Sequence, residues 1–124
     1  SCWIPKRWGV YKLMGDTWKK FAFAHAKKCY PEECCGMLIK KQDNIIYGPC
    51  RNLAKENPEF SFVIDPDDWA YYEDQGEVIG IVHSHPDGEL KFSETDIASC
   101  NHLDVDFYLV CPETEKFISI KPKN

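Results

Sequence analysis

The sequence lacks a cluster of positive charge and lacks a long apolar run. It carries 15 basic and 20 acidic residues, a formal net charge of −5, and its adjacent lysines occur only in isolated pairs. Binding to nucleic acid depends on clustered Lys and Arg that neutralise phosphates, so we expect no nucleic acid partner. No stretch approaches the ~20 apolar residues that a membrane-spanning helix requires, so no membrane span is expected.

The seven cysteines also lack any metal-binding or redox spacing. They lie at positions 2, 29, 34, 35, 50, 100 and 111, and no two of them form a CxxC pair. This absence argues against a structural zinc knuckle and against a redox dithiol. We expect free, buried thiols in a reducing compartment. A signal peptide is not expected either, because Trp3, Lys6, Arg7 and Trp8 interrupt any apolar run at the start.

The length and the order of sequence patterns predict one α/β domain. A chain of 124 residues with 44% hydrophobic residues suits a single domain with a core of its own. Helices are predicted over residues 17–29, 66–75 and 93–103, and strands over residues 35–39, 45–47, 60–64, 78–82, 107–110 and 117–120. The run 78–82 is the most apolar and is expected at the centre of one mixed sheet with helices packed against it.

Caps and turns set the expected element ends. Asp16 or Thr17 can cap the first helix. Asp65 is the expected cap of the second helix, with Pro66 at its first position and Gly76 at its end. A turn over residues 42–44 joins the first two strands into a hairpin.

Two histidines and an aspartate form a candidate metal site. His83 and His85 stand at alternate positions after the expected central strand, so both imidazoles can face one point. Asp96 lies in the first turn of the next expected helix. Two histidines and a carboxylate are a common catalytic zinc set that leaves a fourth position for water. Zinc would lower the pKa of that water to about 7.

Each part of this pattern also has an ordinary structural explanation. A His-x-His pair on a strand is often just two surface or partly buried histidines. Ser93 followed by Asp96 is typical of a capped helix start. Both explanations can hold together, because a capped helix start is a rigid platform for a ligand. The complete string from His83 to Asp96 is much rarer than its parts and favours a metal site.

The string from His83 to Asp96 resembles the signature of the JAMM (MPN+) metallopeptidases. His83-Ser84-His85 is followed by seven residues and then by Ser93-Glu94-Thr95-Asp96. That family also uses a glutamate on an earlier strand, and Glu33-Cys34-Cys35-Gly36 matches its surroundings. The resemblance implies an α/β/α fold of the JAMM/cytidine-deaminase type, with a zinc ion held by His83, His85 and Asp96.

The same resemblance implies a role for each residue near the zinc. Glu33 is the expected general acid and base, and Ser93 the expected hydrogen-bond donor to the oxyanion. Glu32 is the adjacent rival, but it would face the other way on an extended chain, so we prefer Glu33. Ser84 points to the opposite face of its strand and is interpreted as structural.

A second resemblance covers almost the whole chain from about residue 16. Its segments, in order, are similar to the N-terminal domain of the K family of lambda-type phage tail assembly proteins. They are residues 25–29, 31–36, 48–52, 65–69, 75–78, 83–96 and 107–111. We therefore assign residues 16–124 to a JAMM domain and residues 1–15 to an N-terminal extension. Its Trp3 and Trp8 could pack on the sheet or belong to an interface, and packing is preferred. In that family an NlpC-type cysteine peptidase domain commonly follows; either the sequence to Asn124 is cut at the domain boundary or this member lacks the second domain.

These resemblances imply a zinc metallopeptidase that hydrolyses a peptide or isopeptide bond in tail maturation or in entry through the cell wall. The expected partners are phage tail proteins or peptidoglycan peptide, and the expected location is the host cytoplasm when made and then the virion tail. One alternative is a free-standing bacterial JAMM isopeptidase, cytoplasmic, that acts on a ubiquitin-like or sulfur-carrier protein. Another is a non-catalytic MPN-type binding module. The match at all three ligand positions, Glu33 and Ser93 favours an enzyme.

Two further functions are disfavoured. A eukaryotic-type deubiquitinase tends to carry insertions that grip ubiquitin, and this chain has no spare length for them. A thiol enzyme using Cys34 or Cys35 would need a nearby histidine, and the histidines outside the zinc string are His25 and His102. His25 lies on the apolar stripe of its helix, and His102 lies near a helix end where it suits the dipole.

Overall fold

One mixed sheet of five strands organises the chain, in the order β2-β1-β3-β4-β5. The computed structural model describes residues 17–58 and 61–123, so the predictions for Asp16, Trp3 and Trp8 lie outside the described residues. The elements are α1 (Trp18–Cys29), β1 (Cys35–Lys41), β2 (Asn44–Cys50), α2 (Pro66–Gln75), β3 (Glu77–Ser84), α3 (Glu94–Leu103), β4 (Asp106–Cys111) and β5 (Lys116–Ile120).

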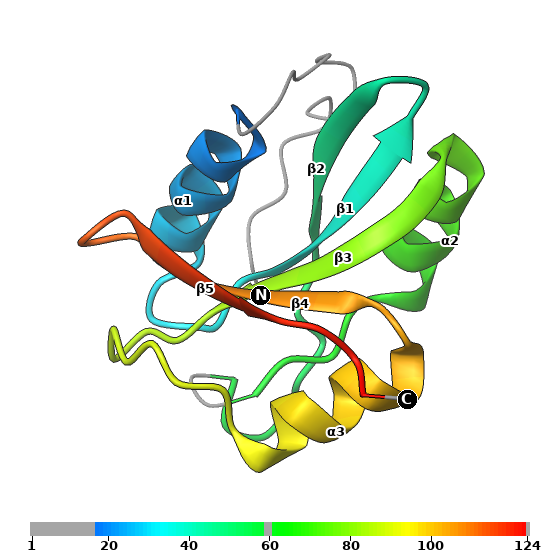
Figure 1. Cartoon of the computed structure of the whole chain (residues 1–124). Coiled ribbons are helices and arrows are strands. Elements are labelled where there is room, and N and C mark those ends of the chain that lie inside the picture. The colour runs from blue at the N-terminus through cyan, green and yellow to red at the C-terminus, as the bar shows by residue number, and fades with distance from the viewer. Residues whose placement is uncertain (1–16, 59–60, 124) are drawn as a thin grey trace.

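Helices cover both faces of the sheet, as Figure 1 shows. On one face α1 buries Trp18, Ala22 and Ala26 against Leu38 and Val82 of the sheet. On the other face α2 and α3 pack over a second cluster, which contains Met37, Ile81 and Phe107 from the sheet together with Tyr72 and Cys100 from the helices. The expected α/β sandwich is confirmed, and each face has its own apolar core.

The central position of β3 places the end of this strand beside three other elements. It pairs antiparallel with β1 and parallel with β4. Parallel neighbours need a crossover connection, and α3 provides it, because it lies between β3 and β4 in the chain. The carboxyl end of β3 therefore lies beside the start of α3 and beside the start of β1, where Cys35 pairs with His83.

The helix starts follow from local chemistry. The side chain of Asp65 accepts a hydrogen bond from the backbone N–H of Asp67 at 2.9 Å, and Pro66 follows as predicted. Thr17 flanks α1 but makes no side-chain cap, since its backbone is already helical. Among the described helices none is long and apolar enough to cross a membrane.

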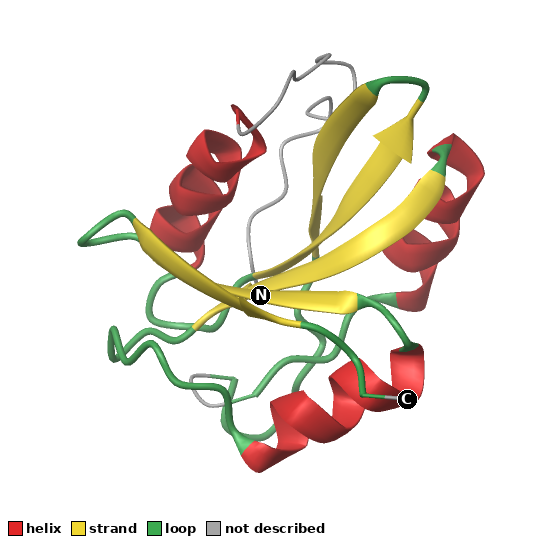
Figure 2. Ribbon diagram, viewed as in Figure 1, coloured by secondary structure: helices red, strands yellow, loops and turns green. Residues whose placement is uncertain are grey.

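Two predictions are wrong. The segment expected as a strand over residues 60–64 is a loop in its described part, with one isolated bridge between Asn52 and Ile64 (Figure 2). The reason is that the Asn52 side chain bonds the Ser61 carbonyl and the Val63 N–H, so that these groups do not join a strand ladder, although the Val63 carbonyl still accepts a bond from the backbone N–H of Leu53. The thiols are not all free: Cys29 is disulfide-bonded. Five others are free and buried as expected, namely Cys34, Cys35, Cys50, Cys100 and Cys111.

Candidate metal centre

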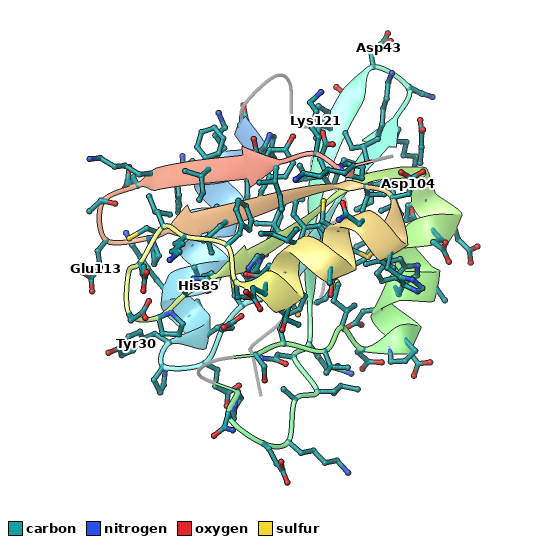
Figure 3. The ribbon with its side chains drawn as sticks, turned by 60° about the horizontal axis from the view of Figure 1, so that its bottom comes forward. Tyr30, Asp43, His85, Asp104, Glu113 and Lys121 are labelled. Atoms are coloured by element: carbon teal, nitrogen blue, oxygen red, sulfur yellow. The ribbon has the colours of Figure 1, made fainter. Side chains whose placement is uncertain are left out.

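The predicted ligands meet where β3 ends and α3 begins. His83 is the next-to-last residue of β3, and His85 follows directly after the strand. Asp96 lies in the first turn of α3. Figure 3 shows His85 beside the amino end of this helix. The site therefore lies at the carboxyl end of β3, beside the first turn of α3.

Asp96 lies within contact distance of both imidazoles. Its Oδ2 atom is 3.2 Å from Nε2 of His83 and 3.4 Å from Nε2 of His85. Glu33 belongs to the same cluster, because ligand atoms of Glu33, His83 and His85 all lie within 4.8 Å of one another. Two imidazoles and two carboxylates, all largely buried, therefore converge on one small volume.

A capping box fixes Asp96. Its backbone N–H donates to Oγ of Ser93 at 3.0 Å, and its Oδ2 accepts from the backbone N–H of Ser93 at 2.9 Å. Such reciprocal bonds satisfy two of the donors that a helix start leaves unpaired. The helix-start explanation and the metal-ligand explanation thus use the same atoms, and the cap holds the carboxylate toward both histidines.

The two imidazoles are held in different ways. Nδ1 of His85 lies 3.1 Å from the backbone carbonyl of Glu89. A carbonyl only accepts, so Nδ1 carries the proton and Nε2 presents its lone pair to the cluster. His83 is fully buried, and among the described residues neither of its ring nitrogens has a hydrogen-bond partner. Its Nε2 is near Asp96, but the pair does not meet the geometry of a hydrogen bond.

These residues fit a bound metal ion. Unsatisfied buried polar atoms are rare in folded proteins, and a cation between Nε2 of His83 and Oδ2 of Asp96 would satisfy this histidine nitrogen. Tetrahedral ligands at about 2.0–2.1 Å from zinc are separated from one another by about 3.3 Å. The observed separations of 3.2 and 3.4 Å match this value. His/carboxylate donors of this kind suit zinc and its neighbours in the first transition row.

The two carboxylates have opposite protonation properties. Burial raises the pKa of Glu33 to about 8, with His85 opposing the rise and the charges of Asp96 and Asp87 adding to it. Burial acts to raise the pKa of Asp96 as well, but the two imidazoles outweigh it and hold that pKa well below its usual range. Environments that separate the pKa values of paired carboxyls also separate their chemical roles.

The histidines differ as well. Burial lowers the pKa of His83, which keeps this imidazole neutral and able to bind a metal. Burial also acts to lower the pKa of His85, but contact with Asp96 and the charge of Glu33 produce a net rise.

Two cavities share Glu33 and Ser93 as lining residues at the cluster. One, of about 280 Å³, is lined in part by Glu33, His85 and Ser93. The other, of about 420 Å³, shares Glu33 and Ser93 and adds apolar side chains that include Phe62. The Phe62 ring stacks on His83 with centroids 4.8 Å apart and planes 30° apart. The cluster is thus open to a ligand on the Ser93 side and shielded behind His83.

The rival residues do not fit the roles. Glu32 lines another cavity, which His85 also lines, but its carboxylate is not grouped with the two histidines as that of Glu33 is. Cys34 and Cys35 are fully buried, and burial raises the pKa of the Cys34 thiol to about 12, so neither has the properties of a nucleophile.

The sequence interpretation missed three contributors, namely Asn52, Phe62 and the carbonyl of Glu89. The signal for Asn52 is only that of a polar residue two positions after the end of β2. Phe62 was assigned to a strand, and a backbone carbonyl leaves no mark in the sequence.

Comparison of the sequence with known proteins identifies the family of this chain. The model of the family described as prokaryotic homologs of the JAB domain matches residues 19–120. Tail tip assembly protein K of Escherichia phage N15 is 41% identical over 100 residues, which are 81% of this chain and 41% of that protein. The protein of the same name from Escherichia phage lambda is 41% identical over 51 residues, 41% of this chain and 26% of that one. The chain thus spans less than half the length of these relatives.

Solved structures show the same fold. A protein from Desulfitobacterium hafniense matches with a TM-score of 0.64 and 22% identity, over 86% of this chain and 80% of that one. A JAB1/MPN domain protein from Archaeoglobus fulgidus matches with a TM-score of 0.59 and 22% identity, over 93% and 92%. With the family model matching most of its length, the chain belongs to the prokaryotic homologs of the JAB domain.

Proposed function

We propose that this domain is a zinc metallopeptidase that hydrolyses a peptide or isopeptide bond. The observation that carries the proposal is the convergence of His83, His85 and Asp96 at 3.2 and 3.4 Å, with Glu33 in the same cluster. Glu33 is 3% exposed and burial raises its pKa. A buried carboxyl with a raised pKa beside a metal site is typical of a proton-transfer group.

His83, His85 and Asp96 are the proposed metal ligands, and residues 16–124 the proposed domain. Zinc bound there supplies Lewis acidity and lowers the pKa of a water molecule to about 7. Asp96 suits a ligand because it stays ionised and is fixed by the helix cap. Glu33 suits proton transfer, since its pKa lies near neutrality. The nearby cation would lower that pKa toward the working range.

Glu33 and Ser93 perform the remaining steps. Glu33 accepts a proton from the attacking water and later delivers it to the leaving nitrogen. Ser93 faces the cavity that Glu33 and His85 also line. Its Oγ accepts the hydrogen bond of the cap through a lone pair, which leaves the O–H proton to donate to the developing oxyanion. The cap therefore orients the Ser93 hydroxyl and leaves its O–H free to donate.

The similarity to two tail tip assembly proteins supports a phage setting. We propose that the domain acts in tail maturation or in cell-wall entry, on a phage tail protein or on peptidoglycan peptide, in the host cytoplasm and then in the virion tail. We also propose that an NlpC-type domain accompanies it in its relatives.

The test combines metal analysis with a cleavage assay. Purified protein is expected to hold about one zinc per chain. The zinc-loaded protein is incubated with a peptide library and with peptidoglycan stem peptides, and new termini are identified by mass spectrometry. Glu33→Gln should keep the zinc and lose cleavage. Zinc binding without cleavage of any peptide by the parent protein would favour a binding module, and cleavage by Glu33→Gln equal to the parent would mean that the base is misassigned.

A further inference from the structure

Asn52 follows β2 and uses every hydrogen-bonding position of its side chain. It is 3% exposed. Its Nδ2 donates to the backbone carbonyls of Glu33 at 3.1 Å and Ser61 at 3.0 Å. Its Oδ1 accepts from the backbone N–H groups of Ala54 at 2.9 Å and Val63 at 3.0 Å. The bonds of this one buried amide join Glu33, two residues before β1, to the loop before α2.

The network fixes the orientation of this amide. Both partners of Nδ2 are carbonyls and both partners of Oδ1 are N–H groups, so the reversed orientation would break all four bonds. Aspartate offers no donors, and glutamine is one methylene longer. Asparagine is thus the side chain that matches two donors and two acceptors at this distance.

Glu33 depends on such contacts because it precedes the first strand. β1 begins at Cys35, so Glu33 receives no ladder bonds. Its N–H donates to the carbonyl of Pro58 at 2.8 Å, and its carbonyl accepts from Asn52. The next N–H, of Cys34, donates to Oγ of Ser84 at 2.9 Å. The backbone of Glu33 is therefore placed by the loop after β2, with Ser84 as a second anchor.

The same loop reaches the metal centre. Phe62 lies between Ser61 and Val63, the two loop residues that Asn52 bonds, and its ring stacks on His83. We propose that Asn52 is a positioning residue that holds Glu33 in register with His83. The effect on turnover rests on the proposed peptidase function, whereas the effect on the placement of Glu33 does not.

The test variant is Asn52→Asp, with Tyr72→Phe as the matched control. Asn52→Asp keeps the shape and the two acceptor contacts, but it loses both donors and sets a carboxylate oxygen against two carbonyls. Tyr72→Phe removes one buried bond, from the Tyr72 hydroxyl to the carbonyl of Pro49 at 2.9 Å. That bond ties α2 to the same strand without contacting Glu33.

Amide hydrogen exchange of the metal-free protein, followed by NMR, is the first measurement. In Asn52→Asp the amides of Glu33 and Cys34 should exchange about tenfold faster or more. The amide of Ile81 in β3 should change no more than global stability requires. In Tyr72→Phe all three amides should follow global stability alone. Unchanged protection of Glu33 and Cys34 in Asn52→Asp would overturn the proposal.

Zinc affinity and cleavage of the peptide library form the second measurement. Competition with a chromophoric chelator should give zinc affinities within about threefold of the parent, because the ligands come from β3 and α3. Cleavage should fall about tenfold or more, and the control should keep both. If the parent protein cleaves no peptide, the proposed peptidase function is wrong, but the hydrogen-exchange measurement still tests the role of Asn52. If Asn52→Asp does not fold, Asn52→Ser, which also lacks the amide donor, takes its place in both measurements.

Discussion

Replacing Glu33 by Gln should change the free energy of unfolding of the metal-free protein in a pH-dependent way. The carboxyl has an ordinary pKa of 4.5, which we take for the unfolded chain, and burial raises it to about 8 in the folded protein. Below pH 4.5 it is protonated in both states. Between these two values the folded state binds more protons than the unfolded state, so stability falls as pH rises. Above pH 8 the loss is complete.

The magnitude follows from this difference. Each pKa unit corresponds to about 1.4 kcal/mol, so the penalty at high pH reaches a ceiling of roughly 5 kcal/mol. By the same relation it is roughly 1 kcal/mol at pH 5 and roughly 3 kcal/mol at pH 7. The Glu33→Gln variant keeps a neutral side chain of the same size and escapes the penalty. Its advantage over the parent should therefore grow by roughly 2 kcal/mol between pH 5 and pH 7.

Urea unfolding in the presence of a chelator, at pH 5, 6, 7 and 8, measures this advantage. Any constant effect of the amide, such as an altered hydrogen bond, shifts all four values together and does not imitate the trend. The titrations of His83 and Asp96 occur in both proteins and largely cancel in the difference, whereas part of the difference comes from His85, whose pKa the charge of Glu33 helps to raise. A difference that stays constant from pH 5 to pH 8 would refute the argument that Glu33 is held in an unfavourable environment.

Three other predictions concern single substitutions. His85→Ala should weaken zinc binding about 100-fold or more in chelator competition, and affinity equal to the parent would remove His85 from the ligand set. Ser93→Ala should cost about 1 kcal/mol of stability through the lost cap and lower peptide cleavage about 100-fold or more. Ser93→Thr, which can still cap, should recover the stability in thermal unfolding. Gly36→Ala should destabilise by about 1–3 kcal/mol, because its Cβ would lie 2.4–2.5 Å from buried Tyr47; unchanged urea stability would mean that the ring can move.

The sequence predicted the elements whose signals are local. The cap at Asp65, with Pro66 after it, and the apolar run that becomes β3 depend on neighbouring residues and appear in the structure as expected. The segment near Phe62 failed because an apolar, alternating stretch can face the core without pairing. The Ser61 carbonyl and the Val63 N–H bond one distant side chain, that of Asn52, and no local pattern encodes that choice.

The candidate site also contains residues with a local sequence signal and one residue without it. His83, His85 and Asp96 are close in sequence, so strand alternation and a capped helix start were enough to bring them together. Glu33 lies far away in the chain, and only its resemblance to a family motif pointed to it. The raised pKa of Glu33 depends on burial between separate elements, and single-residue patterns do not report burial of a charged group.

The split of the cluster into a local part and a distant part bears on how such domains change over evolutionary time. The ligand residues share one stretch from the end of β3 to the start of α3. A substitution of Glu33 changes none of these ligand residues. Because burial raises the pKa of Glu33, its replacement by a neutral residue of similar size should favour folding of the metal-free protein at neutral pH. Selection for folding stability alone would therefore not preserve this glutamate.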